Sequence, residues 1–230
     1  MPQQILTKEA LVDEEQQFRK YQWIEVRVSR SQDHRHESFK VKRDSIRVLT
    51  PPLTTRDGWR PRRDIVLPLK APSLCWLAGE CRQNGNLFPT LGVIKPRQIR
   101  KLTIRPDRDT WTESQLGWLR QGLLFDERQR GTRELEKVPF RFTYEFHCEA
   151  TECRGHALMC TDWEMGQAWR RWSVNYGDNW EAKFRAKFEH DMIDKYDTHF
   201  FVGTVFDHPG TWIIIGLFYP PLQTGDVRLF

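Results

Sequence analysis

Four residues that can bind a transition metal lie close together in the second half of the chain. Cys148, Cys153, His156 and Cys160 follow one another with the spacing C-x4-C-x2-H-x3-C. Zinc takes about four nitrogen or sulfur ligands in a tetrahedral arrangement, and a turn between two nearby cysteines commonly presents the first two. Gly155 gives the backbone the freedom that such a tight turn needs. We therefore predict a Zn²⁺ site with a structural role, which would fix the path of this whole stretch.

The fourth ligand depends on the backbone between His156 and Cys160. An extended segment would span roughly 13 Å, which is too far for both side chains to reach one ion. A helical turn would instead bring both side chains to one face. Residues 157–159 (Ala-Leu-Met) are good helix formers, so we predict the turn and favour Cys160 as the fourth ligand. The alternatives are His147, His199 and His208.

The order of ligand types resembles that of the retroviral-type zinc knuckle, a module that binds single-stranded nucleic acid. The resemblance covers only these four positions and the ligand spacings differ, so it is one of chemistry and not of family membership. We interpret the more distant Cys75 and Cys81, in an expected helix over 72–83, as core residues. Five cysteines without a regular framework favour a reducing, cytoplasmic compartment over a disulfide-bonded secreted fold.

Positive charge is concentrated in one part of the chain. The net charge is +5, yet residues 17–108 contain 21 Lys and Arg against 8 Asp and Glu. Most of the basic residues are Arg, whose planar group suits phosphates and base edges. A basic segment in an otherwise acidic chain is typical of a protein that binds a polyanion on one surface. We therefore predict that the protein binds nucleic acid, either DNA or RNA.

Two segments of this basic region are the candidate binding surface. Residues 22–30 and 38–49 alternate in polarity and predict a β-hairpin with a basic face. The next segment, 50–64, contains three prolines and a cluster of arginines, which favours an irregular loop and makes its tryptophan a candidate for base stacking. The candidate nucleic-acid-binding residues are Lys40, Lys42, Arg43, Arg56, Trp59, Arg60, Arg62 and Arg63.

The fold class that the patterns predict is α+β, with sheet in both halves of the chain. We expect a basic, β-rich part over 1–125, a charged connector over 126–139, and a zinc-stabilised α+β part over 140–230. The last part should contain the Cys/His loop, two helices and an apolar hairpin. Its second hairpin strand contains the continuous apolar run WIIIGLF, which indicates a strand buried on both faces.

Two other functions fit the sequence. Asp162 and Glu164 lie next to the Cys/His stretch, and with His147 they could bind a divalent metal for phosphodiester cleavage, which would make the protein a metal-dependent nuclease. The simpler interpretation is that Thr161 and Glu164 form a capping box at a helix start, and we expect a binding protein rather than an enzyme. A third possibility is an adaptor that binds other protein subunits. No membrane partner is expected, because no apolar stretch reaches the length of a membrane span.

Overall fold

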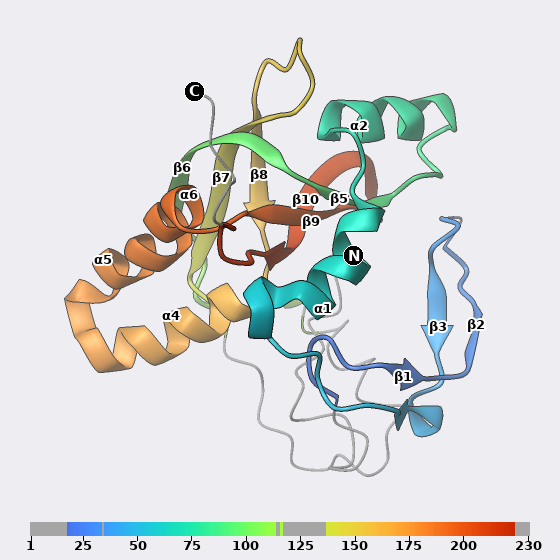
Figure 1. Ribbon diagram of the computed structural model, residues 1–230, viewed down its shortest axis with the longest axis horizontal. Helices are drawn as coiled ribbons and strands as arrows, with labels where there is room; N and C mark the ends of the chain where they lie inside the picture. Colours follow the sequence, from blue (N-terminus) through green and yellow to red (C-terminus); the bar gives the residue numbers. More distant parts are fainter. Residues whose placement is uncertain (1–17, 34, 114–115, 117–136, 224–230) are drawn as a thin grey trace. The chain divides into compact units, whose positions relative to one another are not determined.

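The computed structural model describes residues 18–33, 35–113, 116 and 137–223 (Figure 1). The chain forms two compact units, one from residues within 1–53 and 106–140, the other from 54–105 and 141–230. The expected α+β class is confirmed. Within the described residues, no helix is long and apolar enough to cross a membrane.

The second unit is built on a six-stranded mixed sheet with the strand order β5-β9-β10-β8-β7-β6. Strand β10 pairs in parallel with β8, whereas the pairs β5–β9, β9–β10 and β7–β8 are antiparallel. The sheet therefore joins strands from both sides of the predicted connector, and the division at 126–139 does not separate two sheets. The six strands are β5 (Leu91–Ile94), β6 (Pro96–Pro106), β7 (Phe140–Cys148), β8 (His156–Cys160), β9 (His199–Val205) and β10 (His208–Phe218).

Side-chain alternation explains why β7 forms half of a core. Phe142, Tyr144, Phe146 and Cys148 are buried, and the residues between them are more exposed. In contrast, consecutive residues 212–214 of β10 are all buried, as the continuous apolar run predicts. The core of the unit therefore lies along the central strands.

Helices from the second half cover one face of the sheet (Figure 1). The Phe184 ring stacks on Phe142 of β7 with 4.6 Å between centroids, and Phe188 lies 4.7 Å from Phe184. The buried Tyr144 hydroxyl donates to the backbone carbonyl of Phe188, which belongs to a π-helical segment, Ala186–Asp191. The helices are α4 (Trp163–Tyr176), α5 (Trp180–Arg185) and α6 (Met192–Asp194).

The expected irregular loop over 50–64 is wrong at its C-terminal end, because α1 spans Arg56–Val66. Asp57, Gly58 and Trp59 have φ angles of 50°, 61° and 66°, so the regular helix starts only after this left-handed turn. Pro61 then lies in the first regular turn, where its missing N–H breaks no helical hydrogen bond. A 3-10 turn (Leu67–Leu69) follows α1.

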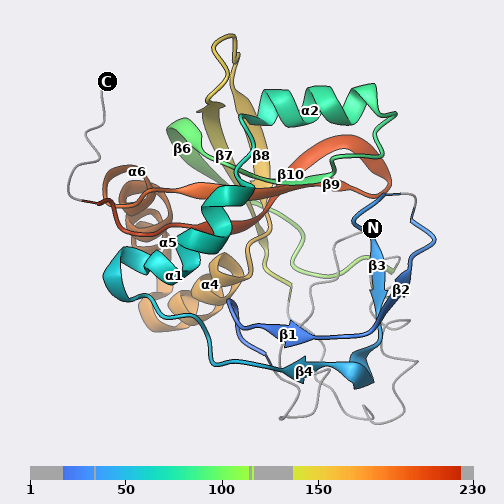
Figure 2. The same cartoon turned by 45° about the vertical axis from the view of Figure 1, so that its right-hand side comes forward.

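Helix α2 (Leu74–Gln83) begins two residues after the predicted start at residue 72 and ends at the predicted residue. The Ser73 hydroxyl caps it by accepting the Trp76 N–H at 3.0 Å. Leu77 of α2 packs on Gly92 of β5 so closely that a Cβ at position 92 would lie 2.6 Å from Leu77 Cδ1. Helix α2 therefore lies against β5 at one edge of the sheet (Figure 2).

The first unit contains two small antiparallel strand pairs. Strand β2 (Val28–Arg30) pairs with β3 (Phe39–Val41), and β1 (Ile24–Glu25) pairs with β4 (Arg47–Val48). The predicted hairpin is therefore present, and every residue of β2 and β3 is exposed. Most of the predicted connector lies outside the described residues.

Candidate metal centre

Three cysteines and one histidine from separate elements meet at one end of the sheet. Cys75, Cys148, Cys153 and His156 each bring one ligand atom to within 4.8 Å of all the others. Within the described residues, no other group of His, Cys, Asp and Glu side chains has this arrangement. The cluster could hold a metal ion such as zinc.

Local structure brings three of the four residues together. Cys148 is the last residue of β7 and His156 is the first residue of β8. These strands are antiparallel, with Phe146 opposite His156, so the strand ends are held side by side. Cys153 lies in the turn that connects them, and the Cys153 N–H donates to the Ala150 carbonyl at 3.2 Å. Cys75 comes from the first turn of α2.

The distances within the cluster suit tetrahedral coordination. Cys148 Sγ lies 3.3 Å from His156 Nε2 and 3.5 Å from Cys75 Sγ, and Cys75 Sγ lies 3.5 Å from His156 Nε2. With Zn–S bonds of about 2.3 Å and Zn–N bonds of about 2.0 Å, neighbouring ligand atoms of a tetrahedron are about 3.5 to 3.8 Å apart. A small adjustment therefore admits an ion.

Backbone groups support the Cys153 sulfur. Cys153 Sγ accepts hydrogen bonds from the N–H groups of Cys148 at 3.3 Å and Gly155 at 3.4 Å. Gly155 has a φ of +97°, and a Cβ there would lie 3.4 Å from the ring of His147. His147 Nδ1 in turn lies 3.2 Å from the Cys153 carbonyl oxygen. His147 thus braces the turn from outside the cluster.

Cys160 is not part of the cluster, and Cys75 takes its place. The predicted helical turn over 156–160 is wrong, because these residues form β8 and the extended chain carries Cys160 to the far end of the strand. The sequence held a signal for Cys75. The buried stripe of α2 consists of Leu74, Leu77 and Cys81, and Cys75 lies off that stripe. A cysteine beside the core stripe can point to a ligand instead of to the core.

The surroundings shift the pKa values of the Cys148 and Cys75 thiols in opposite directions. Burial raises the pKa of Cys148, but hydrogen bonds from backbone N–H groups, Ala150 first among them, and from His156 outweigh burial and lower the pKa to about 6. Burial, the hydrogen bond to Cys148 and the charge of Cys148 raise the pKa of Cys75 to about 12. Without a cation the cluster therefore holds one thiolate readily and resists a second.

The comparisons with known proteins place this cluster inside one family region. Residues 70–230 match a family described as a domain of unknown function, DUF8757. The chain belongs to this family. Residues 7–68 match a second domain of unknown function, DUF8758. No curated protein and no solved structure matches the chain. All four cluster residues lie in the DUF8757 region.

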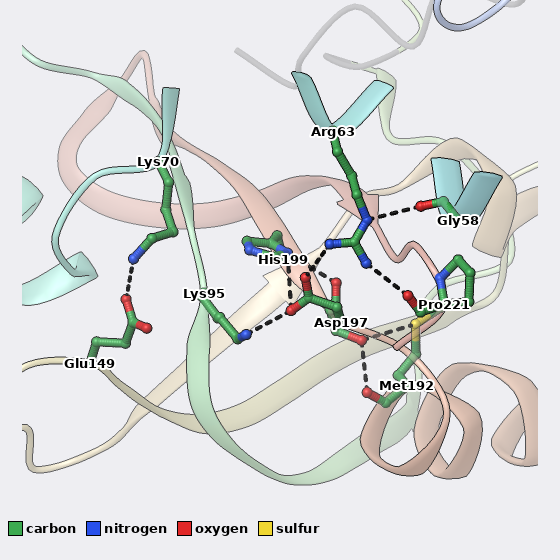
Figure 3. Close-up of polar contacts among 10 residues, drawn as sticks. Gly58, Arg63, Lys70, Lys95, Glu149, Met192, Asp197, His199 and Pro221 are labelled. Atoms are coloured by element: carbon green, nitrogen blue, oxygen red, sulfur yellow. Dashed lines mark hydrogen bonds and ion pairs between the residues drawn. The ribbon is translucent and has the colours of Figure 1, made fainter. Parts of the chain in front are cut away.

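The candidate nucleic-acid residues fall into exposed and buried sets. Lys40, Lys42, Arg56 and Arg60 are exposed. Arg63 is buried instead, and its guanidinium donates to Gly58 O at 2.9 Å, Asp197 Oδ2 at 3.1 Å and Pro221 O at 2.7 Å (Figure 3). Arg63 is therefore part of the fold and is not available to a ligand.

Trp59 is half-buried and already has aromatic neighbours. Its ring centroid lies 5.9 Å from Phe218 and 5.5 Å from Tyr219, and the Arg62 guanidinium lies 4.9 Å from the ring. No apolar residue flanks Trp59 in the sequence, but Phe218 at the end of β10 and the following Tyr219 supply these contacts. The backbone of Arg43 lies in a short 3-10 turn before β4.

The candidate nuclease residues have other partners. Asp162 is buried and caps α4, with Oδ1 accepting the N–H groups of Glu164 at 2.8 Å and Met165 at 3.3 Å, and Oδ2 accepting the Leu217 N–H at 2.9 Å. The cap is therefore Asp162 and not Thr161. Glu164 accepts the Tyr219 hydroxyl at 2.6 Å. Neither acid joins the metal cluster.

A second buried polar group surrounds Asp197, and Figure 3 shows it between two cations. Asp197 lies 2.7 Å from Lys95 Nζ and 3.1 Å from Arg63 Nη1, and its carbonyl oxygen lies 3.0 Å from His199 Nδ1. Burial raises the pKa of Asp197, but the neighbouring Lys95, His199 and Arg63 hold it below the ordinary value of 3.8. This group ties α1 to the start of β9.

Proposed function

We propose that the protein holds one zinc ion in the Cys75/Cys148/Cys153/His156 cluster and that this ion is structural. The convergence of three thiols and one imidazole carries the proposal. Four protein ligands fill a tetrahedral shell and leave no open position for a substrate or an activated water. Cys148 and Cys153 are also buried, which limits access to the ion. A structural role follows from a closed shell.

The ion would cross-link parts of the chain that are far apart in the sequence, and the described cysteines form no disulfide between them. Cys75 lies on α2, and the other three ligands lie on the β7–β8 end. An ion pair between Lys70, which precedes α2, and Glu149, which follows β7, lies in the same region of the sequence (Figure 3). Both groups are partly exposed, and such pairs contribute little to stability. The metal would therefore be the main cross-link between α2 and the end of the sheet formed by β7 and β8.

Cysteine replacements in one helix test the zinc site. Cys75→Ser should reduce bound zinc well below one ion per chain, because a neutral hydroxyl is a poor zinc ligand. Cys81→Ser is the matched control, since Cys81 is buried in the same helix outside the cluster and should leave the zinc content unchanged. Metal content is measured by mass spectrometry on protein purified without chelator. Wild-type protein without bound zinc under these conditions would refute the proposal.

We further propose that the protein binds nucleic acid through exposed cations, including those of α1. Arg56 and Arg60 are exposed, and in the described part of the chain neither forms an ion pair with the nearby Asp57 or Asp64. Arginines that are not neutralised by their own neighbours keep their charge available to phosphates. This observation favours a polyanion ligand over a merely solvated surface.

Salt dependence tests this second proposal. Each cation that contacts a phosphate contributes about 0.7 to 0.9 to the slope of log K against log salt. The double variant Arg56→Gln, Arg60→Gln should therefore flatten that slope by about 1.4 to 1.8 units. Arg63→Gln is the control, because Arg63 is buried and its loss should lower stability while the slope stays unchanged. Absence of binding to DNA and RNA at about 50 mM salt would contradict the proposal.

A further inference from the structure

In the described part of the chain, one face of strands β6, β7 and β8 carries exposed and partly exposed side chains. The opposite face of β7 carries the buried aromatic residues that pack on Phe184 and Phe188. On the open face, Thr143 lies opposite Met159, and Glu145 lies opposite Ala157. Ala157 and Met159 are exposed, and Thr143 and Glu145 are partly exposed. This three-strand surface, here called the open face, belongs entirely to the second unit.

The charged residues of the open face are mostly basic. Lys101 Nζ lies 3.2 Å from Glu145 Oε1, and the Thr103 hydroxyl donates to the same oxygen at 3.0 Å, which places the odd-numbered residues of β6 on this face. Alternation then adds Arg97 and Arg105, both exposed. These three cations form a row about 26 Å long. Exposed Arg141 on β7 also lies on this face, where Glu145 is the only acid among the described residues.

At the adjoining edge of the sheet, side chains from the helices pair with the backbone of β6 near the middle of the strand. Strand β6 is an edge strand, and its unpaired backbone groups would ordinarily attract another strand. At Leu102, however, the N–H donates to Glu189 Oε1 at 2.9 Å and the carbonyl accepts from Arg185 Nη1 at 2.7 Å. Arg185 and Glu189 also pair with each other at 2.8 Å. Strand addition is therefore blocked at Leu102.

The remaining residues of the open face indicate how a ligand would be held. They are Ile99, Thr103, Thr143, His147, Ala157 and Met159, and none is Phe, Tyr or Trp. Base stacking normally uses such aromatic platforms. A nucleic acid on this surface would therefore be held through its phosphates, which carry no direct sequence information.

We propose that the open face binds the phosphate backbone of a nucleic acid without sequence preference. The inference rests on the proposed nucleic-acid binding and assigns a second contact surface besides α1. Charge complementarity supports it, because a row of cations with one compensated acid matches a polyanion. Among the described residues of this face, the exposed apolar side chains are limited to Ala157 and Met159. The α1 cations and the open face would then contribute separately to the total number of phosphates neutralised.

The experiment compares three double variants that each remove two positive charges. Arg97→Gln, Arg105→Gln changes the open face, and Arg56→Gln, Arg60→Gln changes α1. Arg171→Gln, Lys183→Gln changes exposed residues of α4 and α5 and is the control for net charge. Binding to labelled single-stranded and duplex DNA of several sequences is titrated from about 50 to 200 mM salt. Unchanged melting temperatures confirm that each variant is folded.

The expected result is a slope flatter by about 1.4 to 1.8 units for the open-face variant, equal for all sequences, and an unchanged slope for the control. A further variant, Met159→Glu, keeps every cation but adds a carboxylate among them and should also weaken binding. If the open-face variant behaves like the control while the α1 variant loses affinity, the open-face inference is overturned and the proposed function stands. If wild-type protein binds no nucleic acid, both fail.

Discussion

Individual buried ionisable groups in this protein are stabilised by particular partners. Asp197 is buried between Lys95 and Arg63, and His199 is buried beside it. Burial lowers the pKa of His199 below 6.5, although the nearby Asp197 acts in the opposite direction. A group whose pKa is lower in the folded state stabilises the fold above its unfolded pKa and loses that contribution as the pH falls. Both residues therefore act in the same direction.

We predict that stability falls on acidification in two stages. Below about pH 6.5 the unfolded chain protonates its histidine more readily than buried His199 does, and below about pH 3.8 the same applies to Asp197. His199→Gln should remove the first stage and leave the second. Urea unfolding of both proteins between about pH 5 and 8, a range that brackets the ordinary histidine pKa, measures the difference in their free energies of unfolding. Parallel pH curves for wild type and His199→Gln would contradict the assignment.

At the scale of elements, one carboxylate joins a helix to a strand. Asp162 accepts two N–H groups at the start of α4 and the Leu217 N–H of β10. The residue therefore satisfies helix donors and a strand donor at once, and a variant without the carboxylate loses all three hydrogen bonds. A single side chain thus fixes where α4 begins relative to the central strand.

We predict that Asp162→Ala lowers the free energy of unfolding by about 2 to 4 kcal/mol, the sum of a lost cap and an unsatisfied buried N–H. Glu164→Gln is the comparison, because Glu164 is partly exposed and its hydrogen bond to Tyr219 can be kept. It should cost little. The same variant addresses the nuclease alternative, in which Glu164→Gln would abolish Mg²⁺-dependent cleavage at unchanged stability. Chemical denaturation and a cleavage assay separate the two.

At the scale of the whole molecule, the family regions and the compact units divide the chain differently. The family regions meet between residues 68 and 70, whereas the second unit starts at Thr54 and excludes 106–140. Helix α1 lies in the DUF8758 region, yet Arg63 bonds to Asp197 and Pro221 in the DUF8757 region. The DUF8757 region is therefore completed by a helix from the preceding one.

We predict that removing the metal destabilises the second unit as a whole. An ion that binds only the folded state adds about 2.7 kcal/mol when its concentration is 100 times the dissociation constant. A strong zinc chelator should lower the melting temperature, and Zn²⁺ should restore it while Mg²⁺ does not, because thiolates prefer the softer ion. Differential scanning fluorimetry measures the shift, and the Cys75→Ser protein should show none. An equal shift in that variant would argue against the cluster as the site.

Local patterns in the sequence determined much of this protein. Alternation predicted β7 and its buried face, the apolar run predicted the buried strand β10, and close spacing predicted Cys148, Cys153 and His156 as neighbours. Such features follow from side-chain periodicity and short chain separation, which act within a few residues.

Only the tertiary structure decided the remaining contacts. Cys75 joins the cluster from 73 residues away, and Arg63 turns inward to an aspartate 134 residues away. Both depend on which strands are neighbours and on where α1 and α2 pack. No local propensity encodes these choices, because they minimise unpaired buried charge and unfilled volume over the whole core. Pairing of 156–160 with β7 likewise makes this segment a strand, and the extended chain carries Cys160 away from His156.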